Sequence, residues 1–74
     1  MNRNQRLNHV NDDHKRIVEA GGGIYVRGML ANLVLFNSPQ TRSTLALPED
    51  KVTAETVRAK IADSNKSFGI EEAQ

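Results

Sequence analysis

The sequence contains no cysteine and no tryptophan, and each absence removes a class of site. Without cysteine, the 74 residues cannot form a disulfide, a thiolate zinc site or a cysteine nucleophile. The aromatic residues are one tyrosine and two phenylalanines, so a binding mode that stacks nucleic-acid bases on aromatic rings is poorly supplied. The lack of cysteine is typical of a cytoplasmic protein.

Long apolar runs are also absent. The longest run, Leu33–Phe36, is far shorter than the roughly 20 residues of a membrane-spanning helix. Residues 1–16 are polar and lack the apolar core of a signal peptide. We therefore expect a cytoplasmic protein with no membrane partner.

Neither charge dominates, because the formal net charge is +1. The basic residues nevertheless gather toward the front of the chain, and the acidic residues gather toward its end. This distribution is consistent with an ordinary solvated surface, or with a basic binding segment. For the second interpretation the candidate partner-binding residues are Arg3, Arg6, Lys15, Arg16, Arg27 and Arg42.

The first apolar periodicity predicts a helix. The stripe comprises Leu7, Val10, His14, Ile17 and Val18, at helical spacing. Asn8 or Asn11 is expected to cap this helix, which places Asp12 and Asp13 favourably in its first turn. Residues 1–6, rich in Asn and Arg, are expected to form a flexible basic arm.

The glycine triplet Gly21–Gly23 is expected to end that helix, because glycine adopts the left-handed conformation that closes a helix. A dinucleotide-binding loop would need a third glycine where Val26 stands, and would follow a strand rather than a helix. No Gly-Lys-Ser/Thr sequence follows for a nucleoside triphosphate. We predict chain reversal here and no cofactor.

The β-branched and aliphatic residues after the glycines predict strands. Because Gly28 marks a turn or a bulge, we expect one strand at about 24–27 and a second at about 31–37. One long bent strand over 24–37 is the alternative.

A turn and a third strand follow. Pro39 fits the second position of a type I turn that opens at Ser38. The third strand is expected at about 41–47, ended by Pro48, and should pair with the second strand as an antiparallel hairpin.

The last segment predicts a second helix. Its apolar stripe comprises Ala54, Val57 and Ile61, with Val52 packing back from before the cap. Thr53 is the expected N-cap, with Glu55 in the first turn. We expect the helix to fray at Ser64–Asn65, and Phe68 and Ile70 to serve as later apolar anchors.

These elements predict an α+β fold in the order α-β-β-β-α. A three-stranded antiparallel sheet buries one face against one or both helices, with Val57 and Ile61 packed beside Val34 and Phe36. The globular domain is expected over 7–70, between the basic arm 1–6 and an acidic tail 71–74.

The four-residue apolar run within this sheet needs an explanation, because a sheet with one wet face alternates apolar and polar residues. Leu33–Phe36 implies that both sheet faces are covered. Either the two helices lie on opposite faces, or one face meets another chain, including a second copy of this one.

Catalytic and metal-binding signatures are weak. His9 and His14 are five residues apart, which does not place two ligands on one helical face, and the intervening Asp12 and Asp13 point around the helix. The adjacent carboxylates elsewhere diverge in direction. We therefore expect no metal, no catalytic residue and no enzymatic activity.

The composition favours a small regulatory binding protein of bacterial or phage type. We expect it to dock on a larger protein or protein–nucleic-acid complex through its basic N-terminal segment, with transcription as the expected setting. Two alternatives remain open: a direct DNA- or RNA-binding module that uses the sheet and the basic residues, and a homo-oligomeric structural or assembly subunit.

Overall fold

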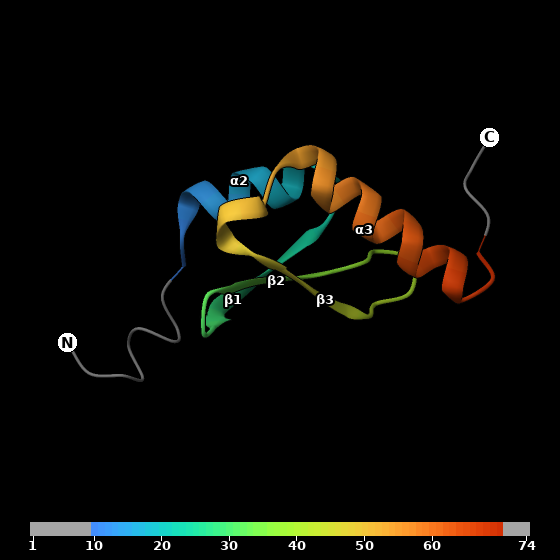
Figure 1. Ribbon diagram of the computed structural model, residues 1–74. Coiled ribbons are helices and arrows are strands. Elements are labelled where there is room, and N and C mark those ends of the chain that lie inside the picture. Colours follow the sequence, from blue (N-terminus) through green and yellow to red (C-terminus); the bar gives the residue numbers. More distant parts are fainter. Residues whose placement is uncertain (1–9, 71–74) are drawn as a thin grey trace.

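Two helices cover one face of a three-stranded antiparallel sheet (Figure 1). This computed structural model describes residues 10–70, and for residues 27–30 the description is limited to the backbone. The elements are α2 (Asp12–Ala20), β1 (Ile24–Leu30), β2 (Leu33–Asn37), β3 (Thr44–Pro48), the short 3-10 helix η1 (Glu49–Lys51) and α3 (Ala54–Ser67). The order confirms the predicted α+β fold, α-β-β-β-α. The expected arm 1–6 and tail 71–74 lie outside the described residues.

Helix α2 starts later than the apolar stripe predicted. Asn11 is its N-cap, and the Asn11 side chain accepts a hydrogen bond from the His14 N–H at 3.0 Å. Asp12 and Asp13 occupy the first turn, as expected, where acidic side chains stabilise a helix. Val10 precedes the helix, while the predicted starting residues Leu7 and Asn8 lie outside the described part of the chain.

The glycine triplet ends α2 with a Schellman motif. The Gly23 N–H donates to the Val18 carbonyl at 2.9 Å, and the Gly22 N–H donates to the Glu19 carbonyl at 3.0 Å. Gly22 has φ +89°, a conformation that other residues rarely adopt. The helix-stop interpretation is therefore confirmed, and its hydrogen bonds are those of chain reversal.

Gly21 has a second role that the sequence did not indicate. A Cβ at Gly21 would lie 2.7 Å from the Ala54 carbonyl oxygen and 2.7 Å from the Val57 Cβ. The absence of a side chain therefore allows the end of α2 to approach the start of α3. The Arg58 guanidinium crosses the same junction and donates to the Ala20 carbonyl at 3.3 Å.

Strands β1 and β2 are two strands rather than one bent strand. They pair antiparallel, with Tyr25 opposite Phe36, and the pairing register shifts between Tyr25 and Met29. The predicted irregularity at Gly28 is thus a bulge inside β1, and the strand continues to Leu30. The reversal comes later, at Ala31, whose φ is +55°.

Strands β2 and β3 form the predicted antiparallel hairpin. Leu35 pairs with Ala46, and β3 ends at Pro48. The connecting loop is longer than a four-residue turn from Ser38, because the Arg42 N–H donates to the Ser38 carbonyl at 2.8 Å. Arg42 adopts φ +64° at this point.

Helix α3 begins as predicted but ends later. Thr53 is the N-cap and forms a reciprocal capping box with Thr56. The expected fraying at Ser64–Asn65 is wrong, because Asn65 is buried and the helix continues to Ser67. A second Schellman motif closes it, with the Ile70 N–H donating to the Asn65 carbonyl at 2.8 Å.

The expectation that Phe68 and Ile70 anchor the end of the fold is also wrong. Phe68 is 62% exposed and Ile70 is 37% exposed. The last turns of α3 extend past the sheet, so these two side chains have no strand to pack against (Figure 1).

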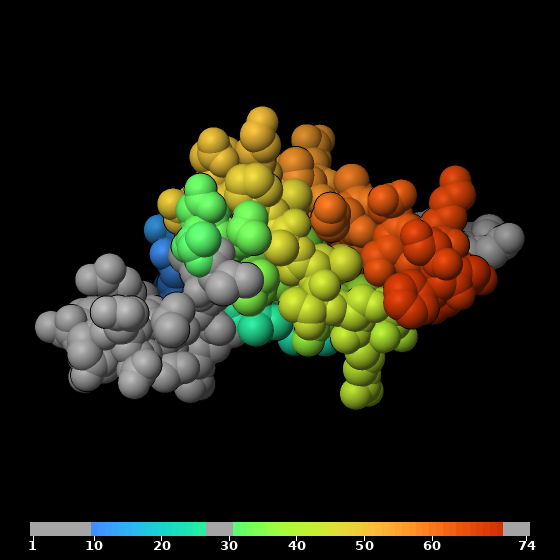
Figure 2. All heavy atoms as spheres, turned by 60° about the horizontal axis from the view of Figure 1, so that its bottom comes forward, coloured from blue at the N-terminus to red at the C-terminus, as the bar shows by residue number. Residues whose placement is uncertain are grey.

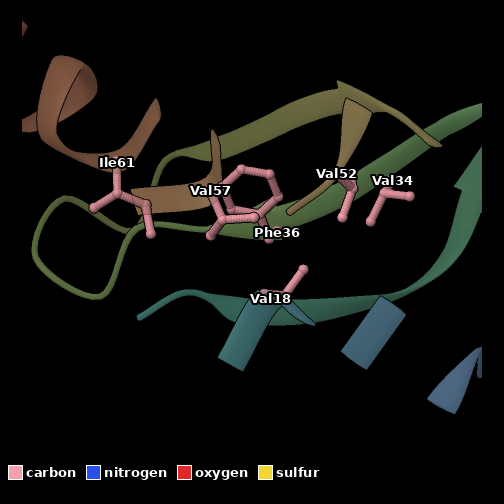
Figure 3. Close-up of a cluster of buried hydrophobic side chains, with 6 residues drawn as sticks. All are labelled: Val18, Val34, Phe36, Val52, Val57 and Ile61. Carbon is pink, nitrogen blue, oxygen red and sulfur yellow. The ribbon is translucent and has the colours of Figure 1, made fainter. Parts of the chain in front are cut away.

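The core lies between the helices and one face of the sheet. Val34 and Phe36 of β2 meet side chains from both helices, as Figure 3 shows. The buried apolar residues are Val18, Val34, Phe36, Val52, Val57 and Ile61, which confirms the predicted packing of α3 on β2. Tyr25, Leu45 and Leu47 are half-buried against this cluster. Because Val34 and Phe36 are two residues apart on one strand, both helices cover the same sheet face.

Within residues 10–70, no helix combines the length and the apolar character that crossing a bilayer requires.

Candidate functional site

The sheet face opposite the helices is the most distinctive surface of the described chain. Residues that pair across strands share a face, and neighbours along a strand alternate. Val34 and Phe36 point to the helices, so Leu33 and Leu35 point away, together with their partners Pro48 and Ala46. We call this surface the open face; it comprises Ile24, Leu33, Leu35, Asn37, Thr44, Ala46 and Pro48.

The middle of the open face is apolar. Leu33, Leu35, Ala46 and Pro48 are half-buried, whereas the core-facing Val34 on the same strand is fully buried. Ile24, from the edge strand β1, is 50% exposed. Both helices pack on the other face of the sheet, so neither covers the open face (Figure 1).

Polar side chains occupy one end of the open face. Asn37 and Thr44 are paired across β2 and β3 next to the connecting loop, and the Thr44 hydroxyl donates to Asn37 Oδ1 at 3.0 Å. None of the seven residues that define the open face is charged, and the side chains of residues 27–30 on β1 lie outside the description. The surface is therefore apolar in its centre and polar, but uncharged, at the end near the loop.

The structure excludes one of the two explanations for the run Leu33–Phe36. The explanation by helices on opposite faces is wrong, because both helices pack on Val34 and Phe36. The pattern of local apolar residues did not determine on which side each helix lies. Leu33 and Leu35 are therefore apolar residues on a sheet face that neither helix covers.

The candidate basic residues on α2 are exposed and have acidic residues of the same helix as neighbours. Lys15 and Arg16 are both exposed. Arg16 Nη2 contacts Asp13 Oδ1 at 2.6 Å, with both side chains at least 75% exposed. An ion pair this exposed contributes little to stability because water screens it. It nevertheless reduces the positive field that α2 offers to an anionic partner.

The other candidate basic residues lie elsewhere or outside the description. Arg42 is exposed on the β2–β3 loop, which lies beside the C-terminal end of α3 rather than beside α2 (Figure 2). Arg27 belongs to the part of β1, residues 27–30, for which only the backbone is described. Arg3 and Arg6 lie outside the described residues. The described basic residues of α2 and of the loop therefore stand on separate segments.

A partly buried polar cluster fixes the β2–β3 loop to α3, and no local pattern in the sequence predicts it. The Ser38 hydroxyl lies 2.8 Å from Asn65 Oδ1, and the Asn65 Nδ2 donates to Gln40 Oε1 at 2.9 Å. Ser38 is fully buried and Asn65 is 7% exposed. Amides cannot take a proton from a serine, so this cluster positions the loop and provides no catalytic base.

Metal ligation has little geometric support in residues 10–70. No three His, Asp or Glu side chains come together there. His14, a member of the predicted helical stripe, is half-buried, and its Nδ1 is buried without a hydrogen-bond partner among the described residues. The other histidine, His9, lies outside the description.

Comparison with protein-family models, with curated proteins and with solved structures finds no match for this chain.

Proposed function

We propose that this chain is a non-enzymatic protein-binding module that docks through its open face on an apolar surface of a protein. One observation carries the proposal. Both helices pack on one face of the sheet, and Leu33, Leu35 and Ala46 on the other face remain apolar and uncovered by them. Burying apolar surface of this kind is the main driving force of protein association.

The chemistry of the open face favours a protein over a nucleic acid as its partner. Binding to DNA or RNA depends on positive charges that neutralise phosphates, and none of the seven described residues that define the open face is charged. Arg42 and the basic residues of α2 lie on separate segments, which gives less support to a direct nucleic-acid module. The basic arm, with Arg3 and Arg6, stays a proposed second contact.

The test is an affinity capture with a matched pair of variants. Leu35→Glu adds one negative charge in the centre of the open face, and Ala59→Glu adds the same charge at an exposed position of α3. Tagged wild type and both variants are incubated with lysate, with and without nuclease. Circular dichroism first establishes that each variant is folded.

The proposal expects a captured protein that wild type and Ala59→Glu retain, that Leu35→Glu loses, and that nuclease does not affect. Capture that Leu35→Glu leaves unchanged would contradict the use of the open face. Capture that disappears with nuclease would instead favour the direct nucleic-acid alternative.

A further inference from the structure

We infer that the protein surface which covers the open face is the same face of a second copy of this chain. The inference rests on the proposed function and names its partner. The two copies would stack sheet on sheet around a two-fold axis, with the helices of each copy on the outside. Leu33 and Leu35 would then be covered on the side that the helices leave uncovered, as the apolar run Leu33–Phe36 implies.

The small core provides the first argument. Within residues 10–70, the buried apolar side chains number six: Val18, Val34, Phe36, Val52, Val57 and Ile61. Domains of this size bury a smaller fraction of their surface than larger domains do, and many are completed by a disulfide, a metal or oligomerisation. The chain has no cysteine, so a disulfide is not possible. A second copy would bury Leu33, Leu35 and Ala46 from each chain in one additional apolar layer.

The charge of the open face provides the second argument. A face that meets its own copy brings identical side chains close together, so any charge near the axis would meet a like charge. None of the seven residues of the open face is charged. Asn37 and Thr44 lie at one end, and their hydroxyl–amide hydrogen bond already satisfies part of their polarity. A two-fold axis through the centre of the face places this polar end at the rim of the interface, where polar groups are usual.

The β3 edge of the sheet is a poorer route to the same dimer. The Ser38 N–H donates to the Ser43 carbonyl, and the Glu49 N–H donates to the Asn32 carbonyl. These two bonds show which residues of β3 direct their backbone N–H and C=O groups toward β2 and which direct them away from it, because the two directions alternate along a strand. Ser43 and Glu49 therefore direct their backbone groups to β2, while Thr44, Ala46 and Pro48 direct theirs to the outer edge. Pro48 has no N–H, so this edge offers few donors to another strand.

The size of the open face predicts a weak dimer. Three strands spaced about 4.8 Å apart, paired over the five residues of β2 at about 3.3 Å per residue, cover about 240 Å² in projection. A stable dimer commonly buries about 800 Å² on each partner. We therefore expect a dissociation constant between about 1 µM and about 1 mM, with monomer and dimer in exchange.

Sedimentation equilibrium of the full chain from about 5 µM to about 500 µM tests this. Wild type and the matched control Ala59→Glu are expected to shift from monomer to dimer, and Leu35→Glu is expected to weaken the dimer by about 100-fold or more, because two like charges would meet in an apolar layer. The uncharged face also predicts that raising the salt from about 50 mM to about 500 mM changes the dissociation constant by less than about 3-fold.

Isotope-filtered NMR gives a readout that does not depend on a variant. A mixture of ¹³C-labelled and unlabelled wild type is expected to give intermolecular contacts at the methyl groups of Leu33, Leu35 and Ala46. Intermolecular contacts confined to the helices, or a dimer that Leu35→Glu leaves intact, would overturn the inference.

A monomer over the whole concentration range would also overturn it. That result alone would leave the proposed function intact if Leu35→Glu still abolished the capture of a different protein. Loss of both the dimer and the Leu35-dependent capture would end both proposals.

Discussion

Substitution of Gly21 by alanine tests whether the end of α2 must approach α3 as closely as the structure requires. The added Cβ would lie 2.7 Å from the Ala54 carbonyl oxygen and 2.7 Å from both the Cβ and the Cγ1 of Val57. Cβ atoms essentially never come within 3.0 Å of a heavy atom outside their own residue and its two chain neighbours. The neighbours are a backbone oxygen and a fully buried valine, so neither moves without moving α3.

The expected cost follows from two opposing effects. Overpacking a filled site destabilises a protein by about 1–3 kcal/mol. Replacing glycine by alanine also restricts the unfolded chain, which stabilises the folded protein by about 0.4–1 kcal/mol. We therefore expect Gly21→Ala to lower the free energy of unfolding by about 1–2 kcal/mol, which corresponds to a fall in Tm of about 5–15 °C for a domain of this size.

Urea denaturation followed by circular dichroism measures this cost, and Gly22→Asn is the matched control. Gly22 has φ +89° and no atom within 4 Å of an added Cβ, and asparagine tolerates the left-handed conformation. The control is expected to change stability by less than about 1 kcal/mol. Amide shifts near Ala54 and Val57 should move in Gly21→Ala and not in the control. A loss below about 0.5 kcal/mol for Gly21→Ala, with unmoved shifts, would refute the close approach.

Four further predictions address the core, the loop and the basic arm. Ile61→Ala is expected to lower the free energy of unfolding by about 2–5 kcal/mol in urea denaturation, and a loss under about 0.5 kcal/mol would mean that α3 is not docked on the sheet. Asn65→Ala should cost about 1–3 kcal/mol and speed amide hydrogen exchange in the β2–β3 loop, because the buried Ser38 hydroxyl loses its acceptor at 2.8 Å and Gln40 loses its donor on α3; unchanged exchange would contradict this. Arg42→Gly should raise Tm by a few degrees, since its φ of +64° suits glycine, and a fall in Tm would count against strain there. Arg3→Ala combined with Arg6→Ala should weaken binding to a captured protein partner by about 1–3 kcal/mol in calorimetry, or reduce the salt slope by about 2 if the partner is a nucleic acid, and an unchanged affinity would exclude the arm from binding.

The local elements were predictable because their signals are local. Thr53 caps α3 and the glycine triplet ends α2 through hydrogen bonds within a few residues of each other. Val57 and Ile61 are one helical turn apart, so the sequence identified the buried stripe correctly.

The features that sequence reasoning missed depend on contacts between distant segments. Asn65 was expected in a frayed end, but its amide meets Ser38 at a sequence separation of 27 residues. Gly21 has its steric role only because α3 passes close to it. Periodicity identifies an apolar stripe on each helix but carries no information about which sheet face receives it. The open face, and with it the candidate site, therefore required the structure.

The order of the strands has a consequence for how the chain folds. In the sheet the order is β1-β2-β3, so every strand pairs with its neighbour in the sequence. Such local pairings close short loops at a small entropic cost and typically form fast. The junction of α2 and α3 is different, because the Arg58 side chain reaches the Ala20 carbonyl across 38 residues. We therefore expect the meander to form before the two helices meet, so the part of the inner sheet face that Val57 and Ile61 cover stays exposed until α3 docks.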